Sequence, residues 1–417
     1  MDKRDFLRTV GAAATGALLP DLATANSSRH ASLPTPPTAP ADFWQQLRSR
    51  YHLPAGRIDL EQGYNSRMAN DVLEAFVAHV RAINVDGAFY MRTRQVDDKL
   101  ASRTLLAEVA GCSADELIIT RNTTESLDTV IASFDWRAGD EAVMAQQDYG
   151  AMLDMFAQQA RRFGIENRIV SLPFDPASDD EIVQLYANAI TSRTRLLMVC
   201  HMVNITGHIL PVQKIVAMAH EKGVPVVVDG AHAFAQLDFR IPDLGCDYYG
   251  ASLHKWLGCP LGAGLLYVKK ERLPPMWPLL GDRSPDHSID KLNHTGTHPA
   301  ATDLAIVDAV RMHREIGIAR KEARLRSLQQ YWTSKVRGLP RIRLFTPSAP
   351  TRACAIATVG IDGMPAKELA KRLLAEHGIF TVAIGNAGVD GVRVTPQLYT
   401  TTEELDALVA ALRSLAS

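Results

Sequence analysis

The residues best suited to chemistry are an acid and a lysine that lie 26 positions apart. The apolar run Val226–Val228 predicts a buried strand, which ends in Asp229, and Lys255 follows in a later loop. A lysine can hold an aldehyde as a Schiff base, and an acid at a strand end can keep a pyridine nitrogen protonated. The pair therefore has the residue types that pyridoxal phosphate chemistry requires. A solvated lysine and a helix-capping aspartate are the ordinary alternatives.

Other side chains could complete a cofactor site around this pair. His232 follows Asp229 by three residues and could hydrogen-bond the ring phenolate, or it could be a structural histidine. Asn122, Thr123 and Thr124 lie at the start of a predicted helix, where free N–H groups and hydroxyls suit a phosphate. Threonine caps followed by an acid are also common without any ligand. The remaining candidates are Ser252 and His254 beside the phosphate, Asn204 after a strand, Tyr149 to stack on the ring, and Thr297 in a Thr-Gly-Thr turn.

Arg393 is the candidate for binding a substrate. It lies on a predicted short strand in the last part of the chain. A guanidinium there could bind a substrate carboxylate through two parallel hydrogen bonds. A surface ion pair is the alternative.

The composition bounds the remaining function classes. The 417 residues are 47% hydrophobic and 22% charged, with a net charge of -1, which argues against a nucleic-acid or membrane-surface partner recruited by charge. The five cysteines lie far apart without CxxC spacing, so free thiols are expected rather than disulfides or a zinc site, and no metal site is predicted. The body of the chain has no apolar run of transmembrane length.

The first 41 residues differ in character from the rest. Residues 1–25 have the layout of a signal peptide: a basic start, a weakly apolar run at Val10–Leu19 and small residues before a cleavage site. Its segment KRDFLR resembles the twin-arginine export motif, with Lys3 in place of the first arginine. Residues 26–41 read as a flexible linker. The sequence predicts a periplasmic or exported protein if this signal is used and a cytoplasmic one otherwise. A frayed amphipathic N-terminus is the alternative.

Strands alternate with helices through the middle of the chain, which predicts a doubly wound, mostly parallel sheet. The expected strands are 117–120, 141–145, 166–172, 195–201 and 224–229, with 265–269 as a last, antiparallel candidate. The expected helices between them are 123–133, 152–163, 180–190 and 212–222. After Pro299 we expect one long helix over 302–335 and a small α/β unit. The predicted domains are a large one over 71–298 and a small one built from 42–70 and 299–417.

In this order the motifs resemble the class V aminotransferase family of fold-type I pyridoxal phosphate enzymes, over about 58–412. The motifs are Asn122-Thr123-Thr124-Glu125, Asn204-Ile205-Thr206-Gly207, Asp229-Gly230-Ala231-His232, Ser252-Leu253-His254-Lys255, Thr295-Gly296-Thr297 and Arg393 with Tyr399-Thr400-Thr401. The resemblance implies a large doubly wound domain with a smaller α/β domain, and pyridoxal 5'-phosphate as cofactor.

The resemblance also implies roles for the candidate residues. Lys255 would be the Schiff-base lysine and proton shuttle, Asp229 the partner of the pyridine nitrogen and His232 that of the ring oxygen. The other implied roles are ring stacking by Tyr149, phosphate binding by Thr123, Thr124, Ser252 and His254, and carboxylate binding by Arg393. Thr297 would reach the phosphate of a neighbouring subunit, which implies a homodimer.

Two segments resemble the isopenicillin N epimerase-like branch of the family. They are 60–65 and 87–92, and they add Asn65 and Arg92 as substrate-binding candidates. Cysteine desulfurases carry a nucleophilic cysteine shortly before the arginine, whereas 380–392 contains none and Cys354 comes too early, which disfavours that activity.

The expected function is transamination or epimerisation of an amino acid or small amine, with Lys255 taking the α-proton. Three alternatives stay open: a C–S or β-eliminating lyase, a non-catalytic cofactor-binding scaffold, and a nucleotide-binding α/β protein. The last of these lacks the expected GxGxxG or GxxxxGK[ST] loop.

Overall fold

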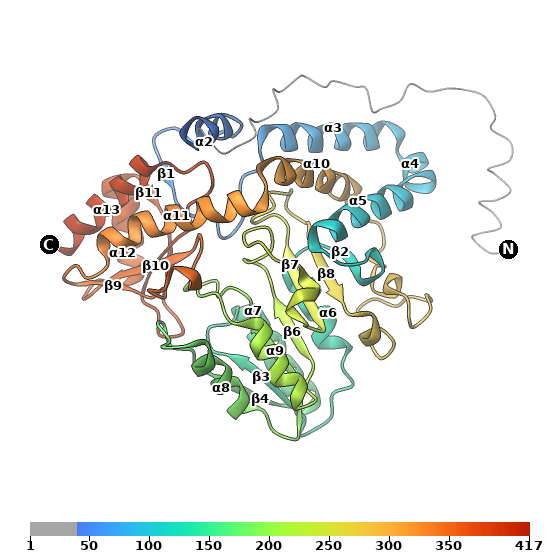
Figure 1. Cartoon of the computed structure of the whole chain (residues 1–417). Helices are drawn as coiled ribbons and strands as arrows, with labels where there is room; N and C mark the ends of the chain where they lie inside the picture. Colours follow the sequence, from blue (N-terminus) through green and yellow to red (C-terminus); the bar gives the residue numbers. More distant parts are fainter. Residues whose placement is uncertain (1–39) are drawn as a thin grey trace. The chain divides into compact units, whose positions relative to one another are not determined.

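The computed structural model describes residues 40–417 (Figure 1). The predicted signal peptide and residues 26–39 of the predicted linker lie outside this range, so the export signal stays a prediction. The described chain begins with helix α2 (Pro40–Ser49). Within 40–417, no helix is long and apolar enough to cross a membrane.

A seven-stranded sheet forms the larger part of the structure. Its strands are β2 (Leu117–Thr120), β3 (Glu141–Ala145), β4 (Glu166–Val170), β5 (Thr194–Cys200), β6 (Val226–Asp229), β7 (Tyr248–Ser252) and β8 (Gly264–Val268). The order across the sheet is β2-β8-β7-β6-β5-β3-β4. Only β8 runs antiparallel to its neighbours, and the other adjacent pairs are parallel. The prediction of a mostly parallel sheet with an antiparallel last strand is confirmed.

Helices cover this sheet and bury its apolar strands. They are α6 (Thr123–Ser133), α7 (Gly150–Phe163), α8 (Asp179–Ala189) and α9 (Val212–Glu221). Helix α6 packs on β7 and β8, and α9 packs on β5 and β6. Every residue of β6 is buried, as expected for a continuous apolar run in a parallel sheet covered on both faces.

Between β1 and the large sheet the chain forms α3 (Asn70–Asp86), α4 (Ala88–Thr93) and α5 (Gln95–Ala110). Helix α10 (Ala300–Ile316) returns from the C-terminal part and packs against α3 and α5 (Figure 1).

A second, antiparallel sheet lies in the C-terminal part, in the order β12-β13-β10-β9. Its strands are β9 (Ile342–Leu344), β10 (Ala357–Ile361), β12 (Val382–Ile384) and β13 (Gly391–Val394), and helices α11 (Ile318–Val336), α12 (Ala366–His377) and α13 (Thr402–Ala416) pack around them. Strand β1 (Ile58–Asp59) pairs in parallel with β11 (Ile379–Phe380), and Leu60 packs into the same core. A segment from the N-terminal part thus joins the C-terminal unit. The domain boundaries themselves stay predictions.

The expected single helix over 302–335 is wrong. The structure has two helices, α10 and α11, which meet at Gly317 with a φ of 81°. A helix cannot continue through that left-handed conformation, which glycine adopts without a steric penalty. The sequence prediction also missed α4 and β7.

Candidate active site

Asp229 lies at the carboxyl end of β6, in the middle of the large sheet. The parallel strands β5, β6 and β7 end at the same edge, where ligands bind in open α/β sheets. The side chain of Asp229 is buried, and its Oδ1 accepts a hydrogen bond of 2.9 Å from the N–H of Ala231. Burial raises the pKa of Asp229, while the Ala231 N–H and the charge of Lys255 act in the opposite direction. A Cβ at Gly230 would lie 1.9 Å from the ring of Tyr249, so this turn requires glycine.

Lys255, His232 and Trp256 form a hydrogen-bonded chain beside Asp229. Trp256 Nε1 donates to His232 Nδ1 at 3.3 Å, and His232 Nε2 lies 3.0 Å from Lys255 Nζ. Burial lowers the pKa of His232 well below its ordinary value, so the imidazole is neutral. Because Nδ1 accepts from Trp256, the proton of the neutral ring is on Nε2 and points at the amine.

That arrangement favours an uncharged Lys255. Only a neutral amine has a lone pair that can accept from His232 Nε2–H. Burial lowers the pKa of Lys255 to about 8, and the charge of Arg393 acts in the same direction. Lys255 is therefore poised as a nucleophile and base close to neutral pH.

The predicted phosphate-binding residues meet at the N-terminus of α6. Asn122 caps the helix, since its Oδ1 accepts from Glu125 N at 2.9 Å. The N–H of Thr123 donates to Ser252 Oγ at 2.9 Å, and the two hydroxyl oxygens are 2.7 Å apart. Thr124 is half-buried in the first turn of the same helix. The hydroxyl of Ser252, at the end of β7, thus reaches a helix N-terminus that favours an anion.

Two further polar groups need a partner that the described chain does not supply. His254 Nδ1 and Asn204 Oδ1 are buried without a hydrogen bond among residues 40–417. Burial lowers the pKa of His254 to about 4, so this ring is also neutral. Buried polar groups are nearly always hydrogen-bonded, so each of these two atoms can take a polar partner from a ligand. A ring with a basic nitrogen, a ring oxygen and a phosphate fits this donor set together with Asp229 and α6. Within the same residues, no group of three or more His, Cys, Asp or Glu could hold a metal ion.

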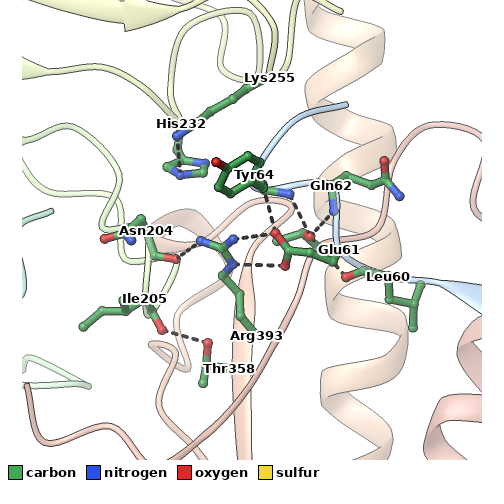
Figure 2. Close-up of polar contacts among 12 residues, drawn as sticks. Leu60, Glu61, Gln62, Tyr64, Asn204, Ile205, His232, Lys255, Thr358 and Arg393 are labelled. Carbon is green, nitrogen blue, oxygen red and sulfur yellow. Dashed lines mark hydrogen bonds and ion pairs between the residues drawn. The ribbon is translucent and has the colours of Figure 1, made fainter. Parts of the chain in front are cut away.

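Arg393 lies on β13, and its side chain is only 8% exposed, so the surface ion pair considered from sequence is wrong. Figure 2 shows its guanidinium pointing at Glu61, which accepts from Nη2 at 2.5 Å and from Nε at 3.3 Å. The third direction is taken by the backbone oxygen of Asn204, which accepts from Nη1 at 3.2 Å. Arg393 thus lies in the site, but its guanidinium is already paired with the carboxylate of Glu61.

Four predicted residues have exposed side chains and are not drawn into this cluster. Tyr149 is 45% exposed at the N-cap of α7. Asn65, Arg92 and Thr297 are also exposed. Thr297 follows Thr295 and Gly296, which line a cavity of about 340 Å³ together with Lys99, Arg103 and Asp290.

Sequence reasoning gave no role to three residues of this region: Glu61, Trp256 and Lys321. Lys321 Nζ donates to the backbone oxygen of Trp256, and burial lowers the pKa of Lys321 to about 7. A signal for Lys321 was available, because it shares the buried stripe of α11 with Leu325, Leu328 and Trp332 at helical spacing. Glu61 carried no such signal, since its partner lies 332 positions away.

Comparison with known proteins agrees with this geometry. A model of the Aminotransferase class-V family matches residues 66–408. Isopenicillin N epimerase of Streptomyces clavuligerus is 29% identical over 394 residues, covering 89% of this chain and 98% of that protein. A probable cysteine desulfurase of Halobacterium salinarum is 30% identical over 341 residues, covering 76% of this chain and 79% of that protein.

Two solved structures show the same fold. The cysteine desulfurase CsdA of Escherichia coli superposes with a TM-score of 0.77 at 24% identity, covering 89% of this chain and 98% of that one. The cystine C–S lyase C-DES with its product cysteine persulfide gives 0.78 at 24% identity, covering 86% and 97%. The fold-type I architecture and the pyridoxal phosphate cofactor expected from sequence are confirmed, and the chain belongs to the class V aminotransferase family of pyridoxal phosphate enzymes.

Proposed function

We propose that this protein transfers the amino group of an amino acid or small amine by transamination, with Lys255 moving the proton. When bound, pyridoxal phosphate supplies an aldehyde that condenses with amino groups and a ring that takes up electrons after C–H cleavage. Asp229 would hold the pyridine nitrogen, His232 the ring oxygen, and Thr123, Thr124, Ser252 and His254 the phosphate.

The observation that carries this proposal is the contact between the amine of Lys255 and the neutral imidazole of His232 at the centre of the site. Burial lowers the pKa of Lys255 to about 8, and in its neutral form Nζ, 3.0 Å from His232 Nε2, can accept a proton and return it at a second carbon on the same face. Transamination needs only this one group. Inversion of configuration needs a second acid on the opposite face, for which Tyr149 is the candidate. Its side chain is 45% exposed, and its hydroxyl has no hydrogen bond within residues 40–417.

Epimerisation is the second candidate, because two relatives that match nearly their whole length carry the name isopenicillin N epimerase. Lyase chemistry is the third, and the C–S lyase neighbour supports it only through its shared fold.

The cysteines give no support to a cysteine desulfurase that uses a thiol nucleophile. Cys112 is half-buried with its pKa raised to about 12, and burial also raises the pKa of the other four thiols. A reactive thiol needs access and a lowered pKa.

The homodimer expected from sequence is likewise a proposal. Thr297 is exposed, and so are the apolar side chains of Val85, Phe89 and Val96 on neighbouring helices. Exposed apolar side chains that gather in this way are typical of an interaction surface.

The test is a product screen of the purified protein with bound cofactor. We would incubate it with D- and L-amino acids and with amines, with and without a keto acid, and analyse products by mass spectrometry and chiral chromatography. Transamination predicts a carbonyl product that requires the keto acid for turnover and is lost in Lys255→Ala but not in Lys371→Ala, an exposed lysine on α12. Inverted amino acid formed without keto acid would instead establish epimerisation, and release of a thiol or ammonia would establish a lyase.

A further inference from the structure

The hydrogen-bonding fork of Arg393 is occupied by this chain. Glu61 accepts from Nε and Nη2, the two parallel N–H directions that a bound carboxylate would use (Figure 2). Both side chains are nearly inaccessible, with 8% of Arg393 and 6% of Glu61 exposed. An incoming carboxylate would therefore compete directly with Glu61.

The backbone around Glu61 is fixed on both sides. Leu60 N donates to Phe380 O at 3.0 Å, and Leu60 O accepts from Thr395 N at 2.8 Å. Thr395 Oγ1 accepts from Gln62 N at 2.6 Å and from Gly63 N at 3.1 Å. These bonds tie the segment to the end of β13, the strand that carries Arg393, so Glu61 and Arg393 are held in register.

The residues next to Glu61 also favour a stable Glu61–Arg393 ion pair. The N–H of Tyr64 donates to Glu61 Oε1 at 2.9 Å, which gives the carboxylate a second partner inside its own turn. A Cβ at Gly63 would lie 2.9 Å from Cζ and Nη2 of Arg393. The glycine therefore leaves the space in which the guanidinium reaches Glu61.

Displacing Glu61 would leave a buried carboxylate without its cation. Removing one partner from a buried pair is strongly unfavourable and corresponds to a loss of affinity of about a hundredfold or more. In addition, the pair has no net charge, so Arg393 attracts an anion weakly while Glu61 is in place. Both effects act against a substrate that carries a carboxylate next to its amino group.

We propose that Glu61 is a specificity-determining residue that withholds Arg393 from the substrate, so that the site prefers primary amines without an adjacent carboxylate over α-amino acids. This inference rests on the proposed function, because it names the substrate class of the same site. Substrates of the preferred class leave the Glu61–Arg393 pair intact and present only an amino group to Lys255.

The test compares substrates that differ only in the carboxylate. The pairs are 2-phenylethylamine with D- and L-phenylalanine, and butylamine with D- and L-norvaline, assayed with the cofactor-loaded protein and a keto acid. We expect kcat/KM to favour each amine by at least about tenfold in the wild-type protein. In Glu61→Gln, which keeps the shape and one acceptor, the ratio of kcat/KM for each amino acid to that for its matched amine should rise by at least about tenfold.

Glu376→Gln is the matched control, because it removes the charge from an exposed Glu–Arg pair on α12. It should leave both ratios unchanged. A wild-type protein that prefers the amino acids would overturn the inference even if Glu61→Gln did not fold. So would a folded Glu61→Gln variant with an unchanged ratio. Absence of a Lys255-dependent cofactor absorbance band would instead overturn the proposed function, which separates the two failures.

Discussion

Lys321 gives the sharpest prediction for stability, because it is a buried lysine whose only hydrogen bond within residues 40–417 is to a backbone carbonyl. Its Nζ donates to Trp256 O, and the titratable groups that face it are Cys259, Cys354 and His313. Burial lowers the pKa of Lys321 from 10.5 to about 7. We predict that Lys321→Met changes both the free energy of unfolding and the way in which that free energy depends on pH.

The direction follows from proton binding in the two states. Between about pH 7 and 10.5 the unfolded chain holds a proton on this lysine that the folded chain has lost, so the wild-type free energy of unfolding rises with pH in this window. The lowered pKa reduces the free energy of unfolding by about 4 kcal/mol at pH 7 and by about 1 kcal/mol at pH 9.5. Methionine has no such titration. Against this, the substitution leaves the Trp256 carbonyl without its donor, a loss of about 1–3 kcal/mol at every pH.

Lys321→Met should therefore be the more stable protein near pH 7 by about 1–3 kcal/mol, and that advantage should fall by about 3 kcal/mol by pH 9.5. Urea unfolding followed by tryptophan fluorescence at several pH values measures the difference. Lys371→Met, on the exposed face of α12, is the control and should stay within about 0.5 kcal/mol of the wild type. A difference between wild type and Lys321→Met that does not vary with pH would refute the reasoning.

Two further predictions concern Lys255. Only the neutral amine attacks an aldehyde, so the rate at which cofactor-free protein takes up pyridoxal phosphate should rise with pH and level off above about pH 8. Stopped-flow absorbance measures this rate. A rate that falls over this range would contradict the lowered pKa of Lys255. Trp256→Phe removes the donor that fixes the His232 tautomer, so turnover should fall about tenfold. The pH at which the rate of pyridoxal phosphate uptake is half-maximal should move to a higher value, while the absorbance band of the bound cofactor is retained. If turnover and this pH are both unchanged, Trp256 contributes only packing.

Local patterns explain why the large sheet and the cofactor side of the site were predictable. Strands 117–120 and 141–145 and helix 123–133 were predicted with the bounds that the structure has. Each is a short apolar or amphipathic run with a clear start, such as the cap at Asn122. The residues predicted to hold the cofactor lie at or shortly after strand ends, so sequence order alone places them at one edge.

Other features depend on contacts that no local pattern records. Strand β7 (YYGAS) has a glycine in its interior because a Cβ at Gly250 would lie 2.9 Å from Ser126 and Leu127 of α6. Glycine has a low strand propensity, so the sequence does not predict a strand here. The break at Gly317 is similar, since α10 and α11 read as one helix until the glycine takes a positive φ. The lowered pKa of Lys255 likewise depends on its place in the fold, where His232 reaches the amine from a separate turn and accepts a hydrogen bond from Trp256.

The substrate side of the site differs from the cofactor side for the same physical reason. Arg393 was identified from its motif, yet its availability to a ligand depends on Glu61, which comes from the other end of the chain through β1 and its pairing with β11. The motif identifies the guanidinium of Arg393, whereas the ion pair with Glu61 determines whether that guanidinium can bind a substrate anion. Members of one family can therefore keep the motifs around the cofactor and still differ in substrate through one acid outside those motifs. In this chain that acid is Glu61, and the comparison of matched amines and amino acids measures what it does.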